Sequence, residues 1–278
     1  MQRIGFMQGR LSPQIDGKIQ AFPWQFWENE FVIAHDAEFE LIEWTLDQDR
    51  MYENPLLLPT GQQRIRELSN ASGLRVSSLT GDCFMQAPFW KAQEGERGSL
   101  LKHLQSILDA CAVVGIRYVV VPLVDNGRLE NDAQRESLLA GLLPLSPWLQ
   151  QNQVEIVFES DFQPDALARL MTLLPDSSFG INYDIGNSAS LGFDPAAEIR
   201  AYGNRIRNVH VKDRLRGGTT VPLGTGNADF PLVFRELARI AYQGDFILQT
   251  ARAKDGEHLD ALIRYRQMVR GWLDASGE

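Results

Sequence analysis

The sequence is poor in cysteine and contains no long apolar run. Its 278 residues include two cysteines, Cys83 and Cys111, both in apolar stretches. A chain of this size with two cysteines has no disulfide framework, so we expect reduced, packed thiols that are poor nucleophiles. No apolar run reaches the roughly 18 residues that a membrane-spanning helix needs, and MQRIGFMQGR lacks a secretory apolar region with a cleavage site. We therefore expect a cytoplasmic protein without a membrane partner.

Basic residues are also scarce relative to acidic ones. The chain has 27 Lys and Arg against 36 Asp and Glu, which gives a formal net charge of −9. Nucleic-acid binding depends on neutralising phosphates with Lys and Arg, so this balance counts against a nucleic-acid partner and favours a small-molecule ligand. A local basic cluster near the last strands either holds an anionic substrate or consists of solvated surface charges; its members are Arg214, Arg216, Arg252 and Lys254.

Short runs of β-branched or aromatic residues alternate with longer amphipathic segments along the whole chain. The pattern predicts strands near residues 4, 43, 78, 120, 157, 182, 209 and 248. It predicts helices at 28–38, 61–72, 97–114, 131–151, 163–174, 229–242 and 257–273, with a weaker pattern at 194–204. This alternation indicates an α/β protein with one domain over residues 1–278, a single (β/α)8 TIM barrel. A doubly wound open sheet is the alternative, but no G-x-G-x-x-G follows the first strand.

Glycine and proline support these boundaries. Gly73 and Gly115 precede predicted strands, where helix-ending glycines are common, and Pro164 and Pro195 stand at the first turns of predicted helices. The longest irregular segments are 10–27 and 81–96, and both are rich in aromatic residues. In a barrel they fall on the catalytic face, where they either wall a pocket or cover the mouth of the barrel.

Four polar residues stand late in four successive predicted strands. They are Glu159 in EIVFES, Asp184 in INYDIGN, His210 in RNVHVKD and Gln249 in FILQT. The carboxyl ends of parallel barrel strands meet at one rim, so we expect these side chains to converge. Three oxygen donors and one imidazole suit Mn²⁺, Mg²⁺ or Co²⁺, with Zn²⁺ as a further candidate. The alternative is that each residue is an ordinary hydrogen-bonded or exposed strand-end residue.

At these residues the chain resembles the sugar phosphate isomerase/epimerase family with the xylose-isomerase-like barrel. Within it, the chain is most similar to pentulose 5-phosphate 3-epimerases and hexulose 6-phosphate isomerases. The motifs that carry the resemblance are FELIEW, EIVFES, YDIGNSAS, NVHVKDR, VPLGTGNADF and GDFILQT. The resemblance implies a sugar substrate and a divalent metal held by Glu159, Asp184, His210 and residue 249. In these epimerases, glutamates at positions 159 and 249 exchange protons with the substrate, and the metal stabilises an enediolate.

The chain departs from the family at residue 249, which is normally glutamate and is Gln249 here. The amide can still bind a metal through its oxygen, but it has no useful proton affinity at neutral pH. A one-base aldose–ketose isomerisation through Glu159 is less affected than a two-base epimerisation. The substitution therefore favours a one-base isomerase or another enediolate reaction, unless a further base exists. Lys212 is the first candidate for that base, followed by Asp213 and Glu43, although Lys212 also suits a structural salt bridge.

Further residues are candidates for substrate binding. Glu43 matches a recurrent acidic position of the family and is a candidate substrate contact or a support for another site residue. Asn187 is a candidate substrate contact or a helix cap. Asp213 is a further candidate, and Arg214 and Arg252 follow the last two barrel strands, whose loops often bind phosphate.

Three other functions are compatible with the same barrel. One of them, an apurinic endonuclease, fits this sequence poorly. Apurinic endonucleases hold three zinc ions with several more histidines than the four of this chain, and Asn187 stands where a further ligand would be needed. A metal-dependent dehydratase would share the metal site and the fold. A catalytically impaired sugar-binding homologue would explain Gln249. The resemblance is also compatible with a homo-oligomer that pairs through its helical faces.

Overall fold

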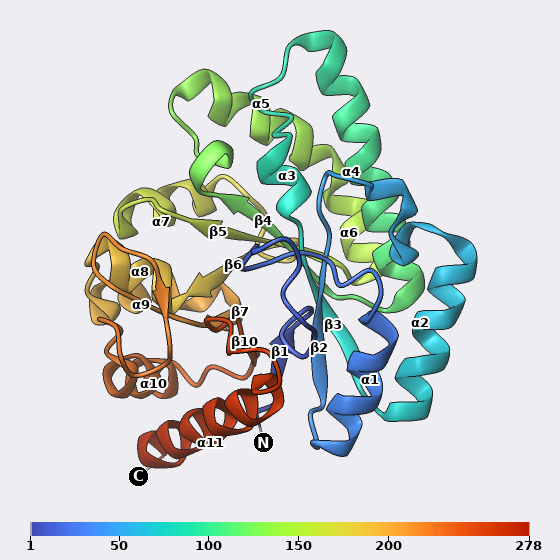
Figure 1. Ribbon diagram of the computed structural model, residues 1–278. Coiled ribbons are helices and arrows are strands. Elements are labelled where there is room, and N and C mark those ends of the chain that lie inside the picture. Colours follow the sequence, from blue (N-terminus) through green and yellow to red (C-terminus); the bar gives the residue numbers. More distant parts are fainter. Residues whose placement is uncertain (1, 278) are drawn as a thin grey trace.

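The computed structural model describes residues 2–277, which form a closed barrel of eight parallel strands inside a ring of helices (Figure 1). Around the barrel the strands follow the order β1-β2-β3-β4-β5-β6-β7-β10, and β10 pairs with β1. Their bounds are β1 Ile4–Met7, β2 Leu41–Thr45, β3 Arg75–Thr80, β4 Tyr118–Leu123, β5 Glu155–Ser160, β6 Phe179–Asp184, β7 Ile206–Val211 and β10 Asp245–Leu248. The predicted TIM barrel is confirmed, as are the eight strand positions, and the open-sheet alternative was wrong.

Helices follow the strands as the amphipathic segments predicted, with two differences. The long helices are α1 Trp27–Asp36, α2 Pro59–Ser72, α4 Glu94–Val114, α5 Asp132–Leu142, α7 Pro164–Thr172, α9 Pro195–Tyr202, α10 Phe230–Arg239 and α11 His258–Ser276. The single helix predicted at 131–151 is wrong, because Pro144 and Pro147 interrupt its hydrogen bonds and a 3₁₀ turn, Leu143–Leu145, separates α5 from α6, Ser146–Asn152. Two short helices, α3 Asp82–Gln86 and α8 Ile185–Leu191, begin directly after β3 and β6, where no helix was predicted.

The remaining elements are short and lie in the connections. Four 3₁₀ turns cover η1 Met51–Glu53, η2 Pro55–Leu57, η3 Asp125–Gly127 and η5 Gly203–Arg205. A two-stranded hairpin of β8, Asp213–Arg214, and β9, Thr220–Val221, follows β7. Gly73 and Gly115 end α2 and α4 with left-handed φ values of 71° and 90°, as predicted, and Pro164 and Pro195 open α7 and α9. None of the helices among the described residues is long and apolar enough to cross a membrane.

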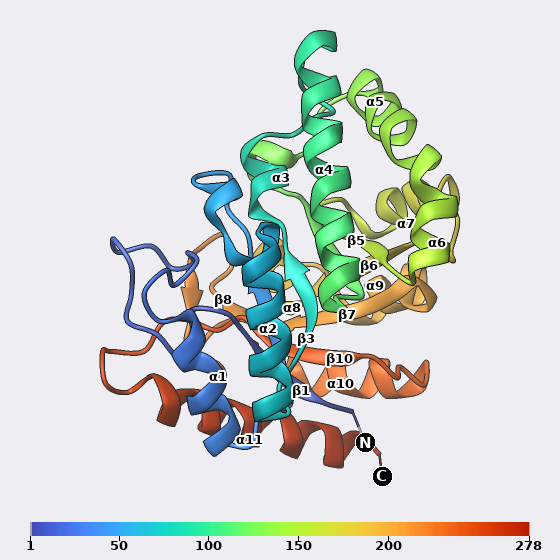
Figure 2. The same cartoon turned by 90° about the vertical axis from the view of Figure 1, so that its right-hand side faces the viewer.

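The main core lies between the strands and the helices. Outward-facing aromatic rings fill this layer, and Phe158 stacks on Phe179 with ring centroids 6.3 Å apart. The last helix, α11, packs against β1 and β10 and covers the seam where the barrel closes, so the first and last elements are neighbours (Figure 2). Because strand residues alternate between faces, the residues between these core positions point into the barrel.

The interior of the barrel is polar toward the carboxyl ends of the strands. Inward-facing positions of β2, β3, β6 and β7 carry Glu43, Ser78, Asn182, Asn208 and His210, all buried. A separate small apolar cluster of Met7, Leu41 and Ile247 shares the same face of its strands. The fold therefore places a hydrogen-bonded polar layer under the carboxyl-terminal rim, where the predicted ligands stand.

Replacing Phe158 by Ala should lower the free energy of unfolding by about 3–5 kcal/mol, because it leaves a cavity between β5 and the helices. Denaturant unfolding of the metal-free protein measures this change. Val113→Ala on α4, where the side chain is 46% exposed, serves as the control and should stay within about 0.5 kcal/mol of the wild type. A loss below about 1 kcal/mol for Phe158→Ala would contradict the assignment of Phe158 to the core.

Candidate functional site

A cavity of about 340 Å³ lies at the carboxyl ends of the barrel strands. Its size is in the range of pockets that hold small molecules. A larger hollow of about 830 Å³ lies between the β1–α1 loop and residues 47–50, but it contains none of the predicted ligands. The polar residues that line the smaller cavity include Gln20, Asp82, Asp125, Arg128, Glu159, Asp161, Asn187, Lys212, Arg214 and Gln249.

Three of the four predicted ligands converge at this rim. Glu159 at the end of β5, Asp184 at the end of β6 and His210 in β7 are buried, and each offers a ligand atom within 4.8 Å of the others. His210 Nδ1 lies 3.2 Å from Glu159 Oε2 and 4.0 Å from Asp184 Oδ2. Two carboxylate oxygens and one imidazole nitrogen at such separations fit one divalent ion, so the chemistry of these donors suits a metal site.

Gln249, just after β10, stands beside this group. Its Oε1 accepts a hydrogen bond of 3.2 Å from Lys212 Nζ, and the same ammonium lies 3.0 Å from Asp184 Oδ2. The amide oxygen therefore faces toward the ligand cluster, while Nε2 donates to Gln20 Oε1 at 3.2 Å. Lys212 reaches the site as expected, but as the charged partner of Asp184, which matches the salt bridge considered from the sequence.

Inside the barrel, Glu43 contacts the nitrogen of His210 that faces away from Glu159. Its Oε1 lies 2.7 Å from His210 Nε2, and Ser78, Thr80 and Asn208 also donate to the carboxylate. An ionised carboxylate only accepts, so Nε2 carries a hydrogen and Nδ1 is left facing Glu159 and Asp184. Glu43 is fully buried and does not line the cavity. The expectation that Glu43 contacts substrate or acts as a base is therefore corrected: it supports a site residue.

The two carboxylates on either side of His210 determine its protonation. Burial alone would lower the pKa of His210, but the negative charge of Glu43 and the hydrogen bonds to Glu159 and Glu43 raise it to about 10. Burial likewise would raise the pKa of Glu43 and of Glu159, but the hydrogen bonds and charge of His210 hold both below the ordinary value. Without a metal, the neutral-pH site therefore holds an imidazolium between two carboxylates.

Hydrogen bonds also orient the Glu159 carboxylate. Asn187 Nδ2 donates to Oε1 at 2.6 Å, and Asn182 Nδ2 donates to Oε2 at 3.1 Å. Arg214 Nη1 in turn donates to Asn187 Oδ1 at 2.8 Å, and both residues line the cavity, as expected of substrate-binding candidates. The helix-cap alternative for Asn187 is corrected, because Asp184 Oδ1 accepts the Asn187 backbone N–H and so caps α8.

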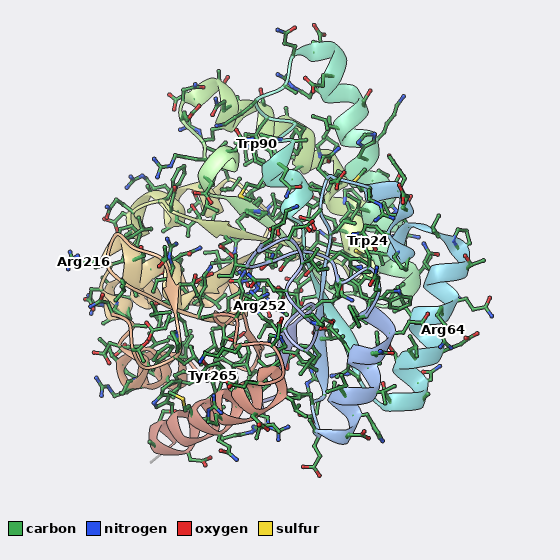
Figure 3. All side chains as sticks on the ribbon, in the orientation of Figure 1. Trp24, Arg64, Trp90, Arg216, Arg252 and Tyr265 are labelled. Atoms are coloured by element: carbon green, nitrogen blue, oxygen red, sulfur yellow. The ribbon has the colours of Figure 1, made fainter. Side chains whose placement is uncertain are left out.

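Asp213 and Arg252 lie outside the cavity. Asp213 is buried and accepts the backbone N–H groups of Gly224, Gly226 and Ala228, so it anchors a loop and is neither a base nor a substrate contact. The Arg252 guanidinium donates to the backbone oxygens of Gly9 and Ser12 in the β1–α1 loop. Figure 3 labels Arg252 near the centre of the molecule. The sequence placed both side chains near the rim but gave no sign that backbone groups would engage them.

Asp82 and Gln20 are cavity residues that the sequence did not single out. Asp82 is the first residue of α3, and its Oδ2 accepts a hydrogen bond of 2.6 Å from Gln20 Nε2. Both come from the two irregular segments expected to wall the pocket, 10–27 and 81–96, and both line the cavity. No motif marked either residue, so only the segments could have been found from the sequence.

Comparison with known proteins yields one family and a consistent set of relatives. The family model of the xylose isomerase-like TIM barrel matches residues 31–270. A putative L-ribulose-5-phosphate 3-epimerase, SgbU, of Escherichia coli K12 is 21% identical over 267 residues, which cover 90% of this chain and 93% of that protein. Two solved structures share the fold: an IOLI protein with a bound zinc atom (TM-score 0.77, 14% identity, 99% of both chains) and an L-ribulose 3-epimerase (TM-score 0.73, 17% identity, 99% and 96%).

Replacing Glu43 by Gln should weaken divalent-metal binding by about 10–100-fold, because the amide no longer holds the Nε2–H of His210 as an ionic acceptor. Isothermal titration with Mn²⁺ measures the dissociation constant. Glu40→Gln, an exposed change just before β2, is the matched control and should leave it unchanged. Equal affinities in the two variants would contradict the supporting role of Glu43.

Metal binding should release about one proton from the protein at pH 7.5. The pKa of His210 is about 10 in the metal-free site, so Nδ1 is protonated there, and a metal ion needs the lone pair of that nitrogen. Titration of Mn²⁺ in two buffers with different ionisation enthalpies gives the number of protons released, which should decline as the pH rises through about 10. His210→Asn removes the imidazole. This variant should therefore bind the metal more weakly and should not release this proton on binding. A wild-type release below about 0.3 proton would argue against a charged His210.

Proposed function

The chain belongs to the xylose isomerase-like TIM barrel family, and we propose that it is a metal-dependent isomerase or epimerase of a ketose or ketose phosphate. The observation that carries the proposal is the convergence of Glu159, Asp184 and His210 at the rim, with the Gln249 oxygen beside them. The named relative is described as a putative L-ribulose-5-phosphate 3-epimerase and one structural neighbour as an L-ribulose 3-epimerase, which supports an isomerase-type enzyme.

We propose that Glu159, Asp184, His210 and Gln249 hold Mn²⁺, Mg²⁺ or Co²⁺, with Zn²⁺ as a further candidate. A bound divalent ion would supply Lewis acidity at the substrate carbonyl and so acidify the neighbouring C–H bond. Glu159 lines the cavity and is the proposed general base, which takes the proton from that carbon. Asn187 and Asn182 orient its carboxylate, which lowers the reorganisation needed for proton transfer.

Positive charges around the cavity suit the enediolate that this proton transfer generates. Lys212 and Arg214 both line the cavity, and we propose that they stabilise the developing oxyanion and bind substrate hydroxyl or phosphate groups. The Lys212 side chain is paired with Asp184 at 3.0 Å, so we propose that it acts as a positive charge at the site. Gln249 supplies a ligand oxygen but accepts no proton, which leaves Glu159 as the base of this set.

A catalytically impaired sugar-binding protein is the second candidate function. The observation that favours it is that the Lys212 ammonium contacts two of the proposed ligands, Asp184 and Gln249. Its positive charge therefore partly replaces that of a metal ion at the site. Such a protein would bind a sugar without exchanging its protons. A dehydratase would share the fold and the ligands and would differ in its product.

A screen of pentuloses and hexuloses, free and phosphorylated, tests the proposal. With Mn²⁺ in D₂O, we expect deuterium to enter a C–H position next to the carbonyl of at least one substrate, and an isomer to form, as seen by NMR. A chelator should abolish both. Glu159→Gln should reduce the rate by about 10²–10⁴-fold, while the exposed Glu96→Gln on α4 should match the wild type. Sugar binding without any exchange would instead support the sugar-binding protein, and loss of water would identify a dehydratase.

A further inference from the structure

The acidic residues around the cavity are unequally matched by positive charge. Glu159 lies beside His210, Asp184 is paired with Lys212, and Asp161 is paired with Arg128 at 2.6 Å. Asp82 faces the same cavity and has no ion-pair partner among residues 2–277. Asp82 is half-buried, and a carboxyl group that is partly withdrawn from water without a cation is costly in its ionised form, so Asp82 is suited to carry a proton.

Asp82 also stands close to the position that lacks a base. Gln20 donates from Nε2 to Asp82 Oδ2 at 2.6 Å and accepts at Oε1 from Gln249 Nε2 at 3.2 Å. The single amide group of Gln20 therefore separates the carboxyl group of Asp82 from the side chain of Gln249. The backbone at this point is held in place, because the end of β3 pairs with β4 and Gly81 N donates to Val120 O.

We propose that Asp82 is a second catalytic proton-transfer residue of this site and takes over the task that Gln249 cannot perform. The inference rests on the proposed function. Glu159 removes the proton from the substrate carbon, and the C–H electron pair enters the double bond of the enediolate. Neutral Asp82 then gives its proton to that carbon, where the electron pair of the double bond forms the new C–H bond. Solvent afterwards takes the proton from Glu159 and returns one to Asp82, so the chemistry balances and the product is the epimer.

The surroundings of Asp82 are compatible with this exchange at neutral pH. Burial first, and then the negative charge of Asp47, raise the pKa of Asp82 to about 7, so both protonation states are populated. Glu159 acts in the same direction, whereas Lys212 and the hydrogen bond from Gln20 oppose it. Asp125 and Arg128, in or next to η3, complete the charged groups around this part of the cavity.

Asp82→Asn separates the two proton transfers. With Mn²⁺ and the ketose that exchanges fastest in D₂O, we expect this variant to form epimer about 10²–10³-fold more slowly than the wild type. Deuterium uptake into unconverted substrate, which needs only Glu159, should stay within about threefold, as should Mn²⁺ affinity. Asp109→Asn, an exposed change on α4, is the matched control for both readouts. The double variant Asp82→Asn, Gln249→Glu should form epimer at least about tenfold faster than Asp82→Asn alone. The new carboxyl group at position 249 is separated from position 82 only by the amide of Gln20.

The outcomes distinguish this inference from the proposed function. If the wild type exchanges no substrate proton, the proposed function fails and the role of Asp82 fails with it. If the wild type exchanges protons but forms no epimer, or if Asp82→Asn forms epimer within about threefold of the wild type, only the role of Asp82 is overturned. Parallel loss of exchange, metal affinity and thermal stability in Asp82→Asn would assign Asp82 a structural role and also overturn it. Asp82→Ser repeats the test if the amide variant does not fold.

Discussion

The contact between Glu43 and His210 inside the barrel is the interaction on which the site depends. Glu43 comes from β2 and His210 from β7, so their 2.7 Å contact crosses the interior of the barrel. Ser78, Thr80 and Asn208 also donate hydrogen bonds to the carboxylate, which offsets the cost of burying its charge. With Nε2 held in this way, the other imidazole nitrogen must face Glu159. A polar interior thus replaces the apolar filling of a simple barrel and sets the direction of the ligands.

Electrostatic pairing continues from this contact to the cavity. His210 is balanced by carboxylates on both sides, and Lys212 neutralises Asp184, so most of the buried charge is matched. Gln249 alters the pattern by contributing an oxygen without a charge. Asp82, which has no ion-pair partner among residues 2–277, is a half-buried cavity carboxyl group that can change its protonation state without breaking an ion pair. The distribution of charge, more than the identity of any one ligand, shapes the chemistry proposed for this barrel.

Much of the fold was predictable because it follows from local patterns. Short β-branched or aromatic runs located the strands and amphipathic segments located the long helices, since both patterns reflect burial within each element. The errors are local as well: Pro144 and Pro147 divide one predicted helix, and α3 and α8 are too short for a recognisable period. At the site, the spacing of Glu159, Asp184 and His210 pointed to a common rim, and the structure brings them together.

The sequence by itself determined which side chains stand at the strand ends and that residue 249 is an amide, because the end of each short apolar run marks the end of a strand. Only the tertiary structure decided what those side chains meet. In the structure Glu43 contacts His210 and does not line the cavity, and Asp213 and Arg252 form hydrogen bonds with backbone groups. Gln20 and Asp82 come from separate segments of the chain and meet at the cavity. These contacts join residues far apart in the chain, and their geometry depends on barrel closure and loop packing, which no local pattern records.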